Sequence, residues 1–207
     1  MITEIGLVAS TLSTGGRIRK NPVLAMALLL ALLCSSLSAE EKKEAATPTM
    51  PQMEMGAPKE LKKMHWQLGN WKAQMKHKMD PSGPWMEETG SGKIFLSLDS
   101  CVIQSEFSNP MMGMSMKGMG MLTYSRDMKK YQSYWVDNIF GSPSFYECDL
   151  DSAGNMTCEG LDRMMGMTYH GRTVAKQVNA NSWTFEYFMS MDGKMWDKSM
   201  EMTLTRQ

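Results

Sequence analysis

Apolar and polar residues alternate along most of the chain after residue 59, a period typical of β-strands with one buried face. The first alternating segment follows Gly69. One of its faces is mainly cationic, and the other contains Trp71, Ala73, Met75, His77 and Met79. The same alternation predicts nine further strands, at about 86–97, 101–108, 114–124, 130–139, 144–150, 156–161, 168–178, 182–190 and 196–206.

Turn signals separate these strands at intervals of about 8–15 residues, which is the spacing of sandwiches and barrels. Asp192-Gly193 predicts a hairpin turn between the last two strands. A short helical turn is predicted over residues 59–67, and no long helical pattern lies between the strands. The pattern therefore favours an antiparallel barrel or sandwich over parallel βαβ architectures.

The N-terminal segment has the order of a secretory signal. A positive cluster at residues 17–20 precedes an eleven-residue apolar run at 23–33, and small residues follow as far as Ala39. The run is shorter than the ~20 apolar residues of a transmembrane helix. We therefore expect cleavage after Ala39 and a periplasmic or secreted protein. Lipid attachment at Cys34 is one alternative, although Leu33 precedes it, and an uncleaved membrane anchor is another.

Three segments follow from these features: a signal peptide at 1–39, a disordered linker at 40–58 and a barrel domain at 59–207. The linker holds charges, Ala, Thr and Pro but no aromatic residue, whereas all six Trp lie between Trp66 and Trp196. Lys plus Arg number 22 and Asp plus Glu number 22, which excludes an overall basic nucleic-acid binder. No stable membrane insertion of the mature domain is expected, and the oligomeric state stays open.

Three cysteines remain once Cys34 is removed with the signal. The five-residue turn at 151–155 places Cys148 directly opposite Cys158 in a hairpin. Directly opposed strand residues have Cα atoms about 4.5–5.5 Å apart, which is within disulfide reach. The sequence therefore predicts a Cys148–Cys158 disulfide and leaves Cys101 either buried or available for intermolecular pairing.

Several short motifs follow one another in a fixed order through the domain. They are Leu68-Gly-Asn-Trp71, Gly118-Met-Gly-Met-Leu-Thr-Tyr124, Lys130-Tyr131, Trp135-Val-Asp137, Asp151-Ser-Ala-Gly154 and Glu201-Met-Thr-Leu-Thr-Arg206. In this order they resemble the bacterial domain-of-unknown-function family 1579. The resemblance implies a lipocalin-like barrel and brings no established activity or catalytic residue. The chain departs from the family pattern in its methionine content and its cysteine pair.

The pair Gly69-x-Trp71 also resembles the opening signature of lipocalin-type barrels. In those folds a Trp on the first strand packs under an Arg near the chain end, and Arg206 is the residue this implies here. A guanidinium there stacks on the indole and caps exposed carbonyls where first and last strands meet. The predicted fold is an all-β, antiparallel up-and-down lipocalin-like barrel of about ten strands, preceded by the signal peptide and disordered leader.

No motif indicates catalysis, so no catalytic residue is assigned. An inward face of aromatic residues and methionine predicts non-enzymatic binding of a small apolar molecule in the barrel. The interior candidates are Trp71, Met75, His77, Trp135, Trp183, Phe185 and Tyr187. His77 has two further interpretations: a haem or metal ligand, or a core histidine bonded to a backbone carbonyl.

Methionine is unusually frequent, with 25 copies in the chain. Six lie within residues 111–121, and thioethers are soft ligands that suit Cu(I). The alternative function is therefore a Met-rich periplasmic Cu(I)-binding protein that uses Met111, Met112, Met114 and Met116; otherwise no cofactor is predicted. The bias extends to nearly every strand, which favours a general replacement of Leu, Ile and Val by Met. Oxidant scavenging is a third interpretation.

Overall fold

The alternation that begins near Trp71 becomes a ten-stranded sheet in the computed structural model, which describes residues 54–80, 82–111 and 113–207. A 3-10 helix, η1 (Lys59–Gln67), precedes the strands. The strands are β1 (Gly69–His77), β2 (Met86–Ser97), β3 (Val102–Met111), β4 (Met114–Ser125), β5 (Lys130–Asp137), β6 (Ser144–Leu150), β7 (Met156–Met164), β8 (Met167–Asn179), β9 (Ser182–Ser190) and β10 (Asp197–Arg206). The predicted signal peptide and residues 40–53 of the linker lie outside the described residues.

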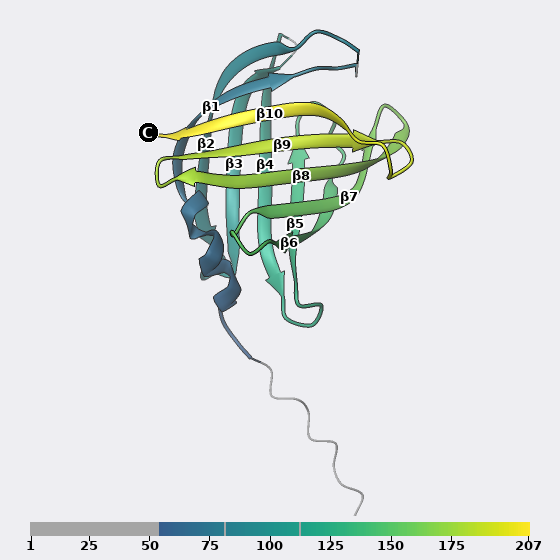
Figure 1. Cartoon of the computed structure of the whole chain (residues 1–207). Coiled ribbons are helices and arrows are strands. Elements are labelled where there is room, and N and C mark those ends of the chain that lie inside the picture. The colour runs from purple at the N-terminus through teal and green to yellow at the C-terminus, as the bar shows by residue number, and fades with distance from the viewer. Residues whose placement is uncertain (1–53, 81, 112) are drawn as a thin grey trace, which may run out of the picture. The chain divides into compact units, whose positions relative to one another are not determined.

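Each strand pairs antiparallel with its sequence neighbour, and β1 pairs with β10, so the sheet closes into an up-and-down barrel (Figure 1). The predicted all-β fold class is confirmed. Several predicted bounds are wrong by one to three residues. The first strand, for example, ends at His77, and Met79 lies beyond it. The chain turns there because Asp80 accepts hydrogen bonds from the backbone N–H and the hydroxyl of Ser82, and Gly83 N–H bonds to the Asp80 carbonyl.

One end of the barrel interior is filled by a hydrophobic core. The helix η1 contributes Leu61 and Met64 to this core, and both are fully buried. The ring of Trp183 on β9 makes two edge-to-face contacts. Its centre lies 5.6 Å from that of Trp66 on the helix and 6.0 Å from that of Trp71 on β1. The hydroxyl of Tyr131 donates to the Glu60 carbonyl at 2.8 Å. The helix is therefore fixed to β5 and β9 and belongs to the core.

The seam between β1 and β10 is covered by Arg206, which lies opposite Trp71. Its guanidinium is centred 4.3 Å from the Trp71 ring and donates to the carbonyls of Leu68 at 2.8 Å, Ala180 at 3.2 Å and Trp66 at 3.4 Å. Gly69 has φ +140°, and an added Cβ would collide with Nη1 of Arg206. A glycine is needed at this position both for its backbone conformation and for the approach of the guanidinium.

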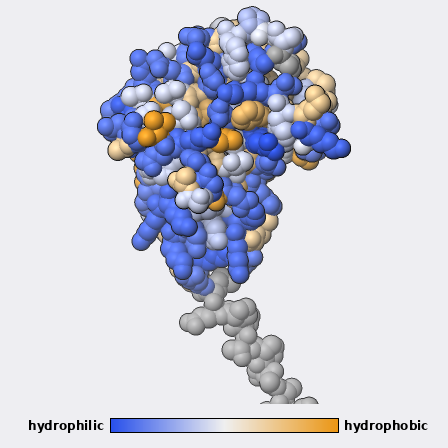
Figure 2. Space-filling view, in the orientation of Figure 1, coloured by the Kyte–Doolittle hydropathy of each residue, from blue (hydrophilic) through white to orange (hydrophobic). Residues whose placement is uncertain are grey.

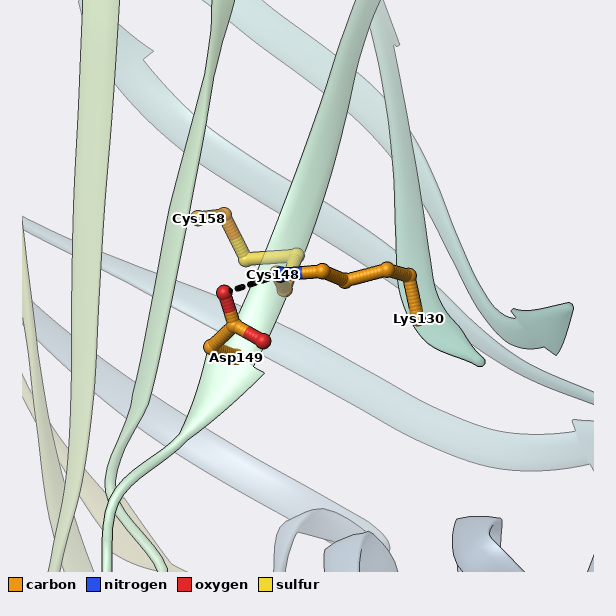
Figure 3. Close-up of a disulfide and its surroundings, with 4 residues drawn as sticks. All are labelled: Lys130, Cys148, Asp149 and Cys158. Atoms are coloured by element: carbon orange, nitrogen blue, oxygen red, sulfur yellow. Dashed lines mark hydrogen bonds and ion pairs between the residues drawn. A yellow bond between two sulfur atoms is a disulfide. The ribbon is translucent and has the colours of Figure 1, made fainter. Parts of the chain in front are cut away.

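A disulfide joins Cys148 on β6 to Cys158 on β7, and both residues are buried in the core (Figure 3). The side chain of the next residue, Asp149, points outward and accepts a hydrogen bond from Nζ of Lys130 at 2.5 Å (Figure 3). The carboxylate of Asp151 shapes the connecting turn. Hydrogen bonds, first from the Asn155 side chain and then from backbone N–H groups, lower the pKa of Asp151. Cys101 is a free thiol.

Candidate functional site

A cavity of about 310 Å³ occupies the barrel interior between the filled core and the rim where Met79 and Phe140 lie. This volume is near the lower limit of small-molecule sites, which range over about 300–1,000 Å³. Of the residues predicted to line the interior, six contribute to this cavity: Met75, His77, Trp135, Trp183, Phe185 and Tyr187. Trp71 does not line it, because its ring is buried under Arg206 at the seam.

An aromatic wall covers one side of the cavity. The rings of Phe107 on β3 and Trp135 on β5 are centred 6.1 Å apart, and Phe140 follows in the loop after β5. Asp137 orients this wall, because one carboxylate oxygen accepts from the Trp135 indole at 3.0 Å and the other accepts from the N–H groups of Ile139 and Phe140 at 2.9 Å. The wall is therefore held in place before any ligand arrives.

Methionine forms much of the remaining apolar surface. The register of β3 and β4 is continuous from Ile103 opposite Leu122 to Met111 opposite Met114, without a bulge at Gly118. Met111 and Met116 are buried and line the cavity, whereas Met114 is 48% exposed at the rim. Met112 lies outside the described residues. Of the three described members of the predicted cluster of four Met, two therefore contribute thioethers to the interior.

A polar cluster of His77, Glu88 and Asn109 lies on the inner surface of β1, β2 and β3. His77 and Asn109 are 1% and 2% exposed, and both line the cavity. Oε1 of Glu88 lies 3.8 Å from Nε2 of His77, too far for a good hydrogen bond. Both ring nitrogens of His77, both amide atoms of Asn109 and Oε2 of Glu88 are buried without a hydrogen-bond partner. Such groups are uncommon in folded proteins and cost free energy.

A second polar group faces this cluster from β7. The buried carboxylate of Asp162 accepts hydrogen bonds from the hydroxyls of Tyr146, at 2.6 and 2.7 Å, and Tyr187, at 2.5 Å. Burial, and then the neighbouring tyrosine and Asp162, raise the pKa of Tyr146 far above its ordinary value. Burial and then Asp162 raise the pKa of Tyr187 in the same way. Both tyrosines therefore keep their protons and hold Asp162 as a satisfied carboxylate.

The two polar groups lie on opposite walls. Around the closed sheet, β7 is five strands from β2 in either direction. The strands that carry Glu88 and Asp162 therefore lie on opposite walls of the barrel. Neither residue was among the predicted interior positions, and neither were Asn109 and Tyr146. The burial of Cys148 and Cys158 implies that Tyr146 and Asp162 point inward, so the predicted disulfide could have identified those two.

Within the described part of the chain, no group of three or more His, Cys, Asp or Glu side chains is placed to hold a metal ion. Over the same residues, no helix has the length and apolar character required to cross a bilayer. The outer surface carrying β8, β9 and β10 is mostly hydrophilic, with scattered apolar residues (Figure 2).

The comparison with family models agrees with the sequence resemblance. The model of the family described as "Protein of unknown function (DUF1579)" matches residues 57–206. A search of curated proteins found no match. Among solved structures, the chain is similar to the S-type phycobiliprotein lyase CPES of Guillardia theta, with a TM-score of 0.49 and 11% sequence identity. That alignment covers 70% of this chain and 90% of the lyase.

Proposed function

Because the chain belongs to DUF1579, a family of unknown function, we propose its function from the barrel itself: non-enzymatic binding of a small, largely apolar molecule in the interior cavity. The observation that carries the proposal is the cavity of about 310 Å³, lined by the aromatic wall and methionine side chains. We also propose that the protein is exported and performs this function outside the cytoplasm.

The chemistry of the lining supports an apolar ligand. Removing apolar surface from water contributes about 25 cal/mol per Å², so a molecule enclosed by thioethers and rings gains affinity from burial alone. Methionine side chains adapt their shape readily because they are unbranched and polarizable. Phe107 and Trp135, by contrast, are held by packing and by Asp137. The cavity thus combines one rigid wall with adaptable surroundings.

Binding can be tested with the neutral fluorescent probe N-phenyl-1-naphthylamine, whose emission rises in apolar surroundings. The protein should bind it, and Met116→Trp, which fills the cavity from β4, should weaken binding at least tenfold. Met119→Trp is the matched control because Met119 lies on the outer face of the same strand and is 36% exposed. Circular dichroism should show that both variants remain folded. Equal affinity in the two variants would place the probe outside the barrel.

Cu(I) binding is the second candidate function, favoured by one observation. The thioethers of Met75, Met111 and Met116 line the same cavity as His77, whose ring nitrogens have no hydrogen-bond partner. Thioether and imidazole groups are suitable Cu(I) ligands. We rank this function second because Met114 lies at the rim and the methionine enrichment extends through most strands.

An anaerobic Cu(I) titration distinguishes the two functions. We expect binding no tighter than micromolar in the protein, and an intact fold when residues 111, 112, 114 and 116 are all changed from Met to Leu. Tight stoichiometric binding that this variant loses would make Cu(I) the primary function. His77→Phe then reports whether the imidazole is one of the ligands.

A further inference from the structure

The His77, Glu88 and Asn109 cluster has hydrogen-bonding capacity that the protein itself does not use. Five of its polar atoms are buried without a partner: Nδ1 and Nε2 of His77, Oε2 of Glu88, and Oδ1 and Nδ2 of Asn109. His77 and Asn109 are more than nine-tenths buried and line the cavity. A polar group on a bound molecule would supply the missing hydrogen bonds.

The three side chains lie on the inward faces of three adjacent strands. His77 is the last residue of β1, and Glu88 lies on β2, diagonal to it in the register. Gly90 is two residues further along β2 and on the same face. A Cβ added at Gly90 would collide with Oδ1 of Asn109, so the amide lies directly against the β2 backbone. Because Gly90 has no side chain, the Asn109 amide lies against the β2 backbone two residues from Glu88.

The charges around the cavity favour a cation over an anion. Asp137 and Asp162 line the cavity, and the register places Glu88 on the inward face of β2, whereas the cationic side chains among the described lining residues are Lys78 and Arg163. Arg163 is exposed, and Nζ of Lys78 lies 5.4 Å from the centre of the Trp85 ring, in the loop beyond β1. Both permanent cations therefore lie near the rim.

A primary ammonium fits the unused acceptors in number and in charge. It carries three N–H donors and no acceptor. Oε2 of Glu88, Oδ1 of Asn109 and an imidazole nitrogen of His77 offer three acceptor positions without donors. A carboxylate head group would instead face Glu88 at close range, and like charges at such distances repel.

We propose that the ligand is an amphiphilic primary amine whose ammonium group binds His77, Glu88 and Asn109, while its apolar body lies between the aromatic wall and the methionine side chains. This inference rests on the proposed binding function and names the ligand class. The ammonium enters as a cation and neutralises Glu88, and its three N–H groups satisfy one acceptor on each of the three side chains.

Displacement of N-phenyl-1-naphthylamine by three eight-carbon compounds tests the ligand class in the full-length protein at pH 8. Octylamine should displace the probe at a concentration at least tenfold lower than octanol, and octanoate should be weakest. Absence of probe binding would contradict the proposed function itself. Probe binding combined with octanol or octanoate matching octylamine would overturn the amine inference and leave the proposed function standing.

Two variants locate the ammonium site. Glu88→Gln should weaken the binding of octylamine about tenfold and leave the binding of octanol unchanged. Glu87→Gln should change neither affinity, because Glu87 points outward and pairs with Lys76 at 3.0 Å. Asn109→Asp replaces the amide with a carboxylate of the same shape and should tighten the binding of octylamine relative to that of octanol. It provides an independent readout if Glu88→Gln fails to fold. An unchanged octylamine-to-octanol ratio in the folded variants would overturn the proposal.

Discussion

Single side chains decide how this barrel closes, and Arg206 is the clearest case. Its guanidinium combines stacking on Trp71 with donation to three backbone carbonyls from η1, the residue that follows it and the β8–β9 turn. Lysine could not replace it, because an ammonium lacks the planar fork that reaches several carbonyls while lying flat on a ring.

Arg206→Ala should lower the free energy of unfolding by about 1–2 kcal/mol, from lost stacking and lost charge-assisted hydrogen bonds. Urea unfolding measures the change. Arg172→Ala is the matched control: Arg172 stacks on Trp196 at 3.9 Å but forms a surface ion pair with Glu159 in place of the carbonyl contacts. Arg172→Ala should lower the free energy of unfolding by less than half as much as Arg206→Ala. Equal losses would mean that stacking alone accounts for the Arg206 effect.

The two tyrosines bound to Asp162 predict a loss of stability at alkaline pH. The raised pKa of Tyr146 and Tyr187 means that the folded protein keeps protons that the unfolded chain releases above pH 10, the ordinary tyrosine value. Stability is therefore fully present below pH 10 and falls as pH rises above it, by about 1.4 kcal/mol per pH unit for each tyrosine.

Tyr187→Phe should reduce this alkaline slope by about half, which urea unfolding between pH 9 and 11.5 would measure. Lys198 and other lysines with raised pKa also contribute to the slope. The difference between the slopes of the unmodified protein and of Tyr187→Phe therefore isolates the contribution of this tyrosine. Absorbance of tyrosinate, with the urea-unfolded protein as reference, provides a second measurement. Ionisation of every tyrosine in the folded protein near pH 10 would contradict the prediction.

At the scale of elements, a disulfide closes the β6–β7 hairpin and joins two cysteines that are ten residues apart in the sequence. On the chain-entropy model, a loop of this length is worth about 2–3 kcal/mol. Changing both Cys148 and Cys158 to Ala should lower the free energy of unfolding by about that amount. Cys101→Ala, which removes the free thiol, is the control and should leave the disulfide intact.

Peptide mapping without reduction checks the connectivity directly. The peptides that contain Cys148 and Cys158 should be found joined, and reduction should separate them. A map that links Cys101 to either partner would contradict the hairpin register, in which Cys148 lies opposite Cys158.

The element pattern was predictable wherever one face of a strand is apolar. In β9, Trp183, Phe185, Tyr187 and Met189 give a clear alternation, and the predicted and observed bounds of this strand coincide. The inner face of β2 carries no such signal near the rim, because its inward residues there are Glu88, Gly90 and Gly92. Periodicity therefore placed the strand correctly but gave no reason to include Glu88 in the site.

Over the whole domain, the site depends on register across many strands. Asp162 meets Tyr146 sixteen residues away and Tyr187 twenty-five residues away. Such contacts need the pairing of four strands to be known at once, which local patterns do not supply. The family resemblance predicted the closed barrel correctly, but a fold does not reveal which interior polar groups lack partners. Those groups became identifiable only from the packed interior.

The disulfide and the N-terminal segment both bear on the compartment in which the protein folds. A disulfide persists in oxidising compartments and is rare in the cytosol, so the Cys148–Cys158 pair agrees with the signal predicted at residues 1–39. Protein recovered from the native host should begin at Glu40 and contain the disulfide, as N-terminal sequencing and intact mass would show. A version lacking residues 1–39 should stay in the cytoplasm with both thiols reduced and be less stable by about 2–3 kcal/mol. Soluble cytoplasmic protein that retains residues 1–39 would contradict export, and lipid mass on Cys34 would replace cleavage after Ala39 with membrane anchoring.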